Sequence, residues 1–363
     1  MRVALVCPYS LNLPGGVQGQ VLSLARALRA MGHQARVLGP CDGPPPEVGV
    51  TPLGNSVTLF ANGSVAAIAP DLPCVLRTFR ALRDEGFDVV HLHEPLVPGP
   101  AMTTLVLGTV PMVGTFHTAG HSAAYAWLRP LTTWMATNLA IRCAVSADAR
   151  DTAAHALGGE YVVLHNGIDV ERYAKATPSP VDGPTILFVS RHESRKGLDV
   201  LLDAMAFLPS DIRLWIASDG PETRRLQARA AGDERIEWLG RITEDEKARR
   251  LRAADVLCAP SLHGESFGIV LLEGMAAQTA IVASDLPGYR NVARHGEEAL
   301  LVPPSDAPAL GAALRRVIEE PSLAASLVAA GDQRAAEFSM DRLAERYLEL
   351  YQAATRSRPG GAR

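Results

Sequence analysis

Short runs of β-branched and other apolar residues alternate with helical patterns along the whole chain, and this alternation constrains the fold more than any other feature. Such alternation is typical of βαβ units, whose strands join in a parallel sheet. The runs predict strands at residues 2–7, 34–38, 88–92, 111–116, 141–145 and 161–164 in the first half, and at residues 185–189, 213–217, 235–239, 256–259, 281–283 and 300–302 in the second. The pattern therefore places the chain in the α/β class.

A Pro- and Gly-rich stretch without periodicity separates the two sets of strands. With 363 residues, the chain is long enough for about two domains. We expect a Rossmann-like domain over residues 1–167, a linker over 168–184 and a second Rossmann-like domain over 185–339, with a deep cleft between the domains. Residues 340–363 predict a helix that packs back on the first domain, followed by a disordered tail.

Charge and cysteine pattern exclude several classes of protein. The net charge of -4 gives no reason to expect binding to nucleic acid. The five cysteines lie far apart without a C-x-x-C pair, which favours reduced thiols over disulfides or a zinc site. The apolar run near the N-terminus is too short for a signal peptide, and the one at residues 101–116 is too short for a membrane span. We therefore expect a cytoplasmic protein, either soluble or peripheral at a membrane.

Two cations follow the strand predicted at residues 185–189, in the stretch RHESRKG. They are Arg191 and Lys196, and Lys196 is one of only three lysines in the chain, with Lys175 and Lys247. Cations in a loop between a strand and a helix are suited to bind an anion such as a phosphate.

A second polar loop, PSLHGESFGIVLLEGMAA, follows the strand predicted at residues 256–259. Ser266, Phe267 and Gly268 stand at the start of a predicted helix, where free N–H groups can hold a phosphate. Glu265 and Glu273 would repel that anion, so they are expected to bind sugar and ribose hydroxyls. The alternatives are a helix-dipole partner for Glu265 and a solvated helix face for Glu273.

The first βα turn, PYSLNLPGGVQGQ, differs from a dinucleotide-binding fingerprint. That fingerprint requires G-x-G-x-x-G directly after the strand and an acidic residue about twenty positions later. Here Gly15, Gly16 and Gly19 come late, and Asp42 is the one acidic residue near the required place, so the pattern argues against a dehydrogenase. A glycine pair at the start of a helix still offers bare N–H groups to an anion.

Histidines gather at the ends of two predicted strands. His91 and His93 share one strand face, Glu94 follows them, and His117 comes one strand later. A zinc site is an alternative, but no ligand spacing is diagnostic. His93, Glu94 and His117 fit the lining of a cleft better, and His91 fits a packed position.

The pair R-x4-K-G and E-x7-E, on the first and fourth βα turns of the second domain, resembles the retaining glycosyltransferases of the GT-B fold, in the family called glycosyl transferases group 1. The resemblance covers nearly the whole chain, through PGGVQ, FHT, NGID, SRHESRKG, SDGPE, ESFGIVLLE and SDLPG. Within that family the chain looks most like the phosphatidylinositol α-mannosyltransferases of actinobacteria, to whose sequences VCPYSLNLPGGVQ, HLHEP, ANGSVA and HGESFGIVLLEGMAA are similar in order and spacing.

The resemblance implies a role for each matching position. Arg191 and Lys196 would clamp the donor diphosphate, and Gly16 would place its backbone against it. Glu265 would hold hydroxyls of the donor sugar, and Glu273 those of the ribose. The residues implied in donor binding are Gly16, Arg191, Lys196, Glu265, Ser266, Phe267, Gly268, Ile269 and Glu273, and those implied in catalysis are His117, Arg191, Lys196, Glu265 and Glu273.

The acceptor side carries a weaker resemblance. Tyr9, Gln18, Asn62, Ser64 and His117 match positions that line an inositol-phosphate site, and His117 would also face the donor sugar. Where the resembled enzymes typically have Tyr, Arg and Lys, this chain has Ala61, Ala67 and Ser122. These departures leave the acceptor open.

Residues 71–87 allow two interpretations with respect to membrane docking. Residues 71–87 predict an amphipathic helix with an apolar stripe and an arginine-bearing side, and the resembled enzymes are more basic here. The pattern favours a core helix with a solvated charged face slightly over a helix that docks on anionic lipid. The apolar stripe comprises Leu72, Val75, Leu76, Phe79 and Leu82, and the other side Arg77, Arg80 and Arg83.

The sequence therefore predicts a retaining glycosyltransferase, with transfer of mannose from GDP-mannose to phosphatidylinositol at the cytoplasmic membrane face as the favoured reaction. The chain contains no D-x-D motif, so the nucleotide sugar is expected to react without a metal or other cofactor. Alternatives are the same chemistry with a UDP-sugar and another lipid or soluble acceptor, a sugar-nucleotide epimerase, and a non-catalytic sugar-binding protein.

Overall fold

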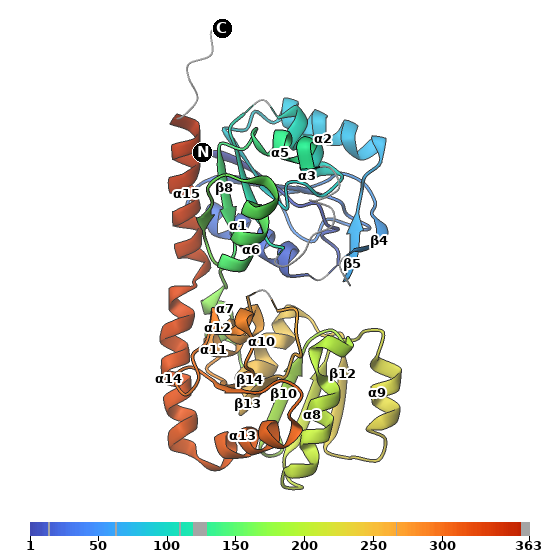
Figure 1. The fold of residues 1–363 in the computed structure, drawn as a ribbon, viewed down its shortest axis with the longest axis vertical. Helices are drawn as coiled ribbons and strands as arrows, with labels where there is room; N and C mark the ends of the chain where they lie inside the picture. Colours follow the sequence, from blue (N-terminus) through green and yellow to red (C-terminus); the bar gives the residue numbers. More distant parts are fainter. Residues whose placement is uncertain (14, 62–63, 109, 119–128, 266, 357–363) are drawn as a thin grey trace. The chain divides into compact units, whose positions relative to one another are not determined.

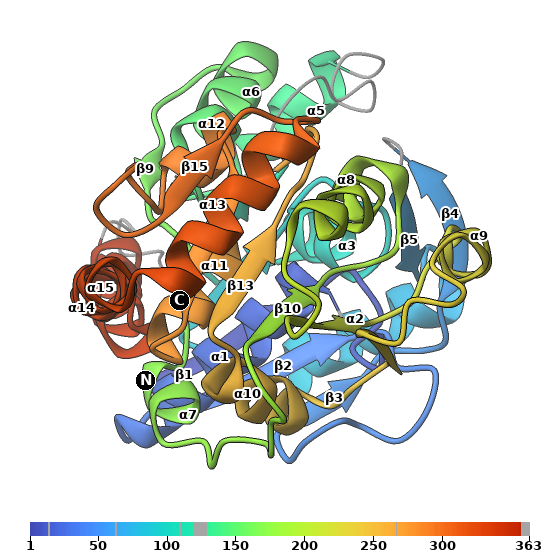
Figure 2. The ribbon, with the colours of Figure 1, turned by 90° about the horizontal axis from the view of Figure 1, so that it is seen from below.

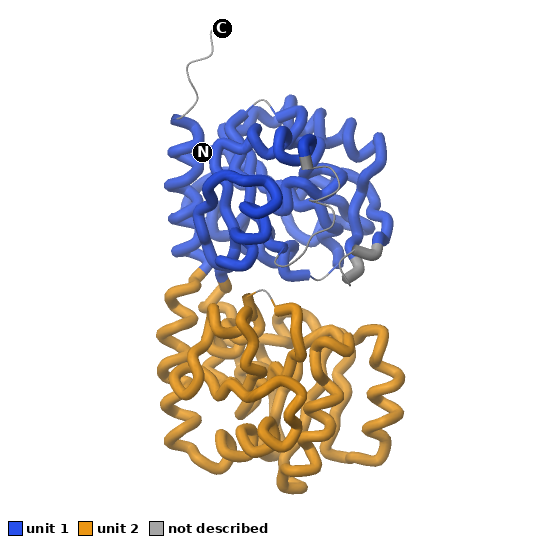
Figure 3. Tube along the Cα trace, in the orientation of Figure 1, with its two compact units in different colours: residues 1–167, 340–363 blue, residues 168–339 orange. Residues whose placement is uncertain are grey.

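The computed structural model describes residues 1–356 except residues 14, 62–63, 109, 119–128 and 266. The chain forms two compact units, unit 1 with residues 1–167 and 340–363 and unit 2 with residues 168–339 (Figure 3). Each unit has a parallel sheet of its own with helices packed on it (Figure 1). The prediction of an α/β protein with two Rossmann-like domains is confirmed. The predicted disordered tail, residues 357–363, lies outside the described residues.

The main sheet of unit 1 is parallel throughout. Its strand order is β3 (Val50–Pro52), β2 (Gln34–Gly39), β1 (Arg2–Val6), β6 (Val89–His93), β7 (Met112–Phe116), β8 (Ile141–Ala144) and β9 (Val162–Val163). The helices of this unit are α1 (Gly16–Ala30), α2 (Leu72–Asp84), α3 (Pro100–Leu107), α5 (Arg129–Ala136), α6 (Ala147–Leu157) and α15 (Met340–Arg356).

Strand β1 shows why both faces of this sheet are covered. Val3 and Leu5 lie in one buried cluster, together with residues of α1 and α15. Ala4 and Val6 lie in another, together with residues of α2, α3 and α5. Successive side chains of a strand point to opposite faces, so an uninterrupted apolar run requires an apolar layer on each side.

A hairpin lies outside the main sheet of unit 1. Strands β4 (Val57–Ala61) and β5 (Ser64–Ile68) pair with each other in antiparallel fashion. The hairpin is tied to the loop after β1, because Tyr9 pairs with Ile68 and the Ser10 N–H donates to the Ala67 carbonyl at 2.9 Å. The apolar runs in the sequence predict neither this hairpin nor β3.

The last helix, α15, belongs to the core of unit 1 although it follows unit 2 in the chain. Tyr347 and Tyr351 are buried there. The Tyr351 hydroxyl lies 2.7 Å from Nδ1 of His91, and the Tyr347 hydroxyl lies 3.0 Å from Oγ1 of Thr115. His91 therefore occupies a packed position, as one interpretation of the sequence had it.

The sheet of unit 2 is also parallel. Its strand order is β12 (Ile236–Gly240), β11 (Arg213–Ala217), β10 (Thr185–Val189), β13 (Val256–Ala259), β14 (Ala280–Ser284) and β15 (Leu300–Val302). The helices of this unit are α7 (Val170–Ala174), α8 (Leu198–Ala204), α9 (Thr223–Arg229), α10 (Glu244–Ala253), α11 (Ile269–Ala276), α12 (Pro287–Arg290), α13 (Ala307–Glu319) and α14 (Pro321–Glu337), with short 3-10 turns η1 (Ser194–Lys196) and η2 (Met205–Phe207).

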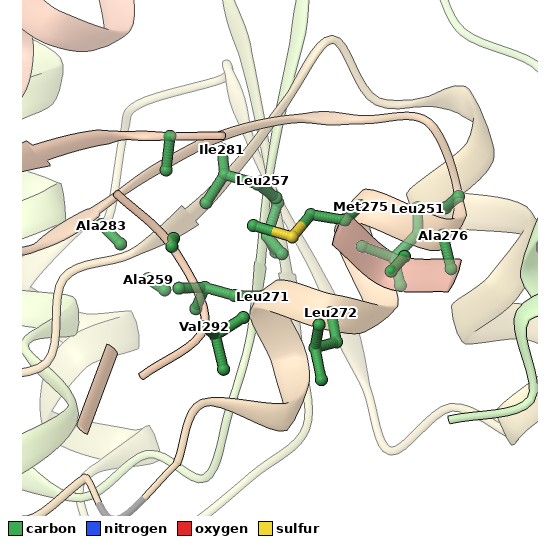
Figure 4. Close-up of a cluster of buried hydrophobic side chains, with 14 of the residues drawn as sticks. Leu251, Leu257, Ala259, Leu271, Leu272, Met275, Ala276, Ile281, Ala283 and Val292 are labelled. Carbon is green, nitrogen blue, oxygen red and sulfur yellow. The ribbon is translucent and has the colours of Figure 1, made fainter. Parts of the chain in front are cut away.

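The core of unit 2 fixes where α11 lies. Leu271 and Met275 of α11 belong to a buried cluster that includes Leu257 of β13 and Ile281 of β14 (Figure 4). This apolar layer holds the helix on the sheet. The loop between β13 and α11 is therefore anchored at both ends.

The stretch predicted as a linker, residues 168–184, is folded into unit 2 and carries α7. The Asp169 carboxylate caps this helix by accepting the Arg172 N–H at 3.1 Å, and Tyr173 is buried in the core. The sequence pattern does not predict α7, because a single helical turn with one buried aromatic residue and one cap shows little periodicity.

Helix α2 packs differently from the core helix that the sequence pattern favours. The inward-facing residues of α2 are Cys74, Thr78 and Ala81. Three members of the predicted apolar stripe, Leu72, Leu76 and Phe79, are exposed. The interpretation of this stripe as a core-facing surface is therefore wrong for these residues. Within the described part of the chain, every helix falls short of the length and hydropathy that crossing a membrane requires.

Candidate active site

The two polar loops singled out in the sequence lie beside each other in unit 2. They follow β10 and β13, which are adjacent parallel strands (Figures 1 and 2). The Leu262 N–H donates to the Arg195 carbonyl at 2.7 Å. Gly197 has a φ of 69°, and a Cβ added there would lie 1.9 Å from the Pro260 carbonyl oxygen. Only glycine allows both the left-handed backbone and this close approach, so the two loops are locked together.

Lys196 and Glu265 form the centre of this cluster. Nζ of Lys196 lies 2.5 Å from Oε1 of Glu265, and their side chains are only 16% and 12% exposed. Ser261 Oγ donates to the same carboxylate oxygen at 2.8 Å. Water screens such a sheltered pair much less than a surface pair. An ammonium group is thus held in a fixed position at the carboxyl edge of the sheet.

Arg191 lies in the same loop but pairs with a different acid. Its guanidinium is 3.0 Å from Oε1 of Glu193, whose other oxygen accepts Nε of Arg195 at 2.9 Å. The Arg191 side chain is 46% exposed, so it is accessible to an incoming anion. The structure therefore brings Lys196, and not Arg191, into contact with Glu265.

Helix α11 begins next to this cluster. Its N-cap, Gly268, has a φ of 91°, and Ile269 is its first residue. Phe267 is 1% exposed and packs against Phe338, so its side chain belongs to the core and not to a ligand-facing surface. Ser266 lies outside the described residues. N–H groups in the first turn of a helix can bind an anion, and such binding at the start of α11 stays a prediction.

Glu273 is sheltered and paired, contrary to the alternative of a solvated helix face. Oε1 of Glu273 lies 2.8 Å from Nζ of Lys247, and both side chains are 13% exposed. Nζ of Lys247 also lies 2.8 Å from Glu244 and 5.9 Å from the centre of the Tyr173 ring. Burial alone would lower the pKa of Lys247, but the two carboxylates raise it. Sequence spacing gives no signal for this pair, because α10 and α11 meet only through the fold.

A second polar cluster lies at the carboxyl ends of β6 and β7 in unit 1. Nδ1 of His93 lies 3.0 Å from Nε2 of His117. The Glu94 carboxylate accepts the His117 N–H and the Thr118 hydroxyl, each at 2.8 Å. Burial lowers the pKa of His117 to about 4, so the His117 ring is neutral at pH 7. A neutral ring donates one hydrogen bond from one nitrogen and accepts one at the other.

The loop after β1 supplies the remaining polar groups of unit 1. Gly16 is the first residue of α1, and Nε2 of Gln18 donates to the Ser10 carbonyl at 3.4 Å. Tyr9 is half-buried beside β5. Asp42 accepts hydrogen bonds from Ser10 and Ser56 and ties these loops together.

The sequence-predicted residues are divided between the two units. Unit 2 holds Arg191, Lys196, Glu265, Gly268, Ile269 and Glu273, and unit 1 holds Tyr9, Gly16, Gln18 and His117. Asn62 and Ser122 lie outside the described residues, and Ser64 is described only by its backbone in β5. Residues that sequence reasoning did not place in a site, but that contact one, are Ser261, Tyr289, Lys247 and Tyr173.

Comparison with known proteins identifies the family. Residues 183–320 match the family described as glycosyl transferases group 1, and residues 14–172 match the one described as glycosyltransferase family 4. The chain is 40% identical to the phosphatidyl-myo-inositol mannosyltransferase of Mycobacterium leprae, with 98% of each chain covered. It is 38% identical to that of Mycolicibacterium smegmatis, with 98% of this chain and 94% of the relative covered.

Solved structures agree on the fold. HepE of Anabaena, in complex with UDP and glucose, has a TM-score of 0.75 at 18% sequence identity, with 97% of this chain and 100% of that chain covered. Sucrose-phosphate synthase of Thermosynechococcus elongatus has a TM-score of 0.74 at 22% identity, with 98% and 100% covered. The chain therefore belongs to the glycosyl transferases group 1 family and is a glycosyltransferase with the GT-B fold.

Proposed function

We propose that this glycosyltransferase moves mannose from GDP-mannose to phosphatidylinositol, with retention of the anomeric configuration and without a metal. The observation that carries the donor site is the sheltered Lys196–Glu265 pair at the carboxyl ends of β10 and β13. The choice of sugar and acceptor is supported by relatives named phosphatidyl-myo-inositol mannosyltransferase that match this chain over almost its whole length. The proposed place of action is the cytoplasmic face of the membrane.

The proposed chemistry follows from where charge develops. As the glycosidic bond breaks, negative charge grows on the departing diphosphate, and fixed cations stabilise it there. Lys196 and Arg191 would supply those cations, with the N–H groups at the start of α11. The leaving phosphate would take the proton of the acceptor hydroxyl on the face from which it departs, so the new bond forms on the same face. In the described part of the chain, no three His, Cys, Asp or Glu side chains are grouped as metal ligands.

The carboxylates would orient the donor. Glu265 would bind hydroxyls of the mannose and Glu273 those of the ribose, because a carboxylate beside a phosphate site favours hydroxyl donors. His117 would face the sugar from unit 1. Tyr9 and Gln18, with Asn62 and Ser64, would bind the inositol phosphate of the acceptor.

A second candidate function keeps the chemistry and changes the substrates. Ala61, Ala67 and Ser122 stand where the resembled enzymes typically have Tyr, Arg and Lys. A UDP-sugar donor with another lipid or a soluble inositol phosphate is therefore the alternative. The epimerase and the non-catalytic sugar-binding protein are set aside, because the chain is a glycosyltransferase.

A donor and acceptor panel tests the proposal. With GDP-mannose and vesicles that contain phosphatidylinositol, we expect release of GDP and formation of an α-linked mannolipid, with no loss of rate in excess EDTA. The measurement is nucleotide release together with NMR of the product's anomeric centre. Turnover of UDP-sugars without turnover of GDP-mannose would refute the mannosyl assignment. Transfer to soluble inositol phosphate but not to the lipid would refute the acceptor.

The exposed apolar face of α2 gives a test of membrane contact. Leu76 and Phe79 are 60% and 44% exposed, and burying such side chains in lipid is favourable. We expect the double variant Leu76→Ser/Phe79→Ser to bind anionic vesicles at least about tenfold more weakly in a co-sedimentation assay. Val48→Ser is the matched control, because Val48 is 93% exposed and lies outside α2. Equal loss in the control would refute a role of α2 in docking.

A further inference from the structure

A buried tyrosine and a buried serine stand behind the candidate catalytic carboxylate of unit 2. Tyr289 of α12 and Ser261, which follows β13, are 1% and 2% exposed. Their oxygens lie 2.9 Å apart, and Ser261 Oγ lies 2.8 Å from Oε1 of Glu265. The three side chains come from neighbouring positions of the sheet, because α12 follows β14 and β14 pairs with β13.

The direction of each hydrogen bond in this row follows from the number of protons. A serine hydroxyl has one proton, and Ser261 donates it to the Glu265 carboxylate. Ser261 Oγ can then only accept from the Tyr289 hydroxyl. Burial and the nearby Glu265 both raise the pKa of Tyr289, so its hydroxyl keeps its proton. The row therefore runs from Tyr289 to Ser261 to Glu265.

Tyr289 also contacts the start of α11. A Cβ added at Gly268 would lie 2.8 Å from Cδ1 of the Tyr289 ring. The ring thus packs directly against the N-cap of the helix whose N–H groups are expected to meet the phosphate. One side chain is placed to fix both the carboxylate and the helix start.

Glu265 needs an anchor other than Lys196. In the structure Lys196 and Ser261 hydrogen-bond to Oε1 of Glu265, and a guanidinium nitrogen of Arg195 lies 3.8 Å from the same oxygen. When a diphosphate binds, the Lys196 ammonium must share its three N–H donors between the phosphate and Glu265. Ser261 can donate to the carboxylate in either state, so it can hold the carboxylate in place and leave the other oxygen, Oε2, for the donor sugar that the proposed function assigns to Glu265.

We propose that Ser261 and Tyr289 are positioning residues for the transfer reaction, with Tyr289 acting through Ser261 to hold the Glu265 carboxylate. This inference rests on the proposed role of Glu265 in binding the donor sugar. A carboxylate held in a fixed position stabilises the transition state more than the bound donor, because the transition state places the strictest requirements on geometry. The two residues should therefore affect kcat more than the KM for the donor.

A double-mutant cycle tests the proposal. Ser261→Ala is expected to lower kcat about tenfold and Tyr289→Phe about threefold, with little change in the donor KM. The kcat of the double variant is expected to be no lower than that of Ser261→Ala alone. Tyr289 acts on Glu265 through the Ser261 hydroxyl, so its hydroxyl has no effect once the serine hydroxyl is removed. Donor affinity is measured separately by calorimetry, so that binding and turnover are compared in the same proteins.

Thr279→Val is the matched control. It removes another buried hydroxyl of unit 2, the one that Thr279 donates to the Leu251 carbonyl, and this hydrogen bond is outside the Glu265 row. The control should lower the thermal midpoint without lowering kcat. If the two single effects instead multiply in the double variant, or if kcat falls only in proportion to the loss of folded protein, the proposal is overturned.

Failure of the proposed function is distinguishable from failure of this inference. The wild-type chain is first assayed with GDP-mannose, and absence of turnover refutes the donor assignment. The cycle is then measured with whichever sugar nucleotide the wild type does use. Wild-type rates in Ser261→Ala with an active donor would refute the positioning role, whatever that donor is.

Discussion

Replacement of Lys196 by alanine is expected to lower kcat about 100- to 1,000-fold, with a much smaller rise in the donor KM. Lys196 is held 2.5 Å from Glu265 in a sheltered position, where its charge is little screened. The charge on the diphosphate grows as the bond breaks, so the ammonium stabilises the transition state more than the bound donor. The measurement is steady-state kinetics together with the donor dissociation constant.

The chain offers a matched control for this variant. Lys175 is another of the three lysines in the sequence and pairs with Glu171 on the surface, where its side chain is 72% exposed. Lys175→Ala should leave kcat unchanged, because exposed ion pairs contribute little. A Lys196→Ala enzyme with unchanged turnover and weakened donor binding would contradict the role proposed for Lys196.

Gly197→Ala is expected to have the largest effect on the structure of the site. The left-handed backbone costs alanine about 1–2 kcal/mol, and the Cβ would collide with the Pro260 carbonyl oxygen. The loops must then separate, which displaces Lys196 from Glu265. A displacement of about 1 Å is enough for a loss of about 100-fold in kcat.

Gly296→Ala separates the cost of the left-handed backbone from the cost of the collision with Pro260. Gly296 has a φ of 78°, close to the 69° of Gly197, but a Cβ there would meet nothing within 4 Å. We expect the free energy of unfolding in urea to fall by about 1–3 kcal/mol more in Gly197→Ala than in Gly296→Ala. Equal losses in the two variants would mean that the close approach to Pro260 does not matter.

The sheets were predictable from the sequence because buried parallel strands are continuous apolar runs. All twelve predicted strands are present, and their ends agree within one residue with the observed strands, for example 185–189 with Thr185–Val189. The hairpin of β4 and β5 could not be predicted in the same way. It lies outside the sheet and exposes Val57 and Leu59, so it lacks the continuous apolar pattern.

The candidate site was predictable only in part. Motif spacing singles out Lys196, Glu265 and Glu273, since each lies at or just after a recognisable βα turn. The partners Ser261, Tyr289 and Lys247 carry no such spacing. Their contacts depend on which strands are neighbours in the sheet and on how α10 and α12 pack. Neither can be predicted from the spacing of residues in a single sequence.

The position of α15 has a consequence for the order in which the protein is built. The chain leaves unit 1 after residue 167, completes unit 2, and returns at residue 340. During synthesis from the N-terminus, all of unit 2 is therefore available before the last element of unit 1. Until α15 emerges from the ribosome, His91 and Thr115 lack the hydroxyl partners that Tyr351 and Tyr347 provide. The unit that begins first is therefore the one that is completed last.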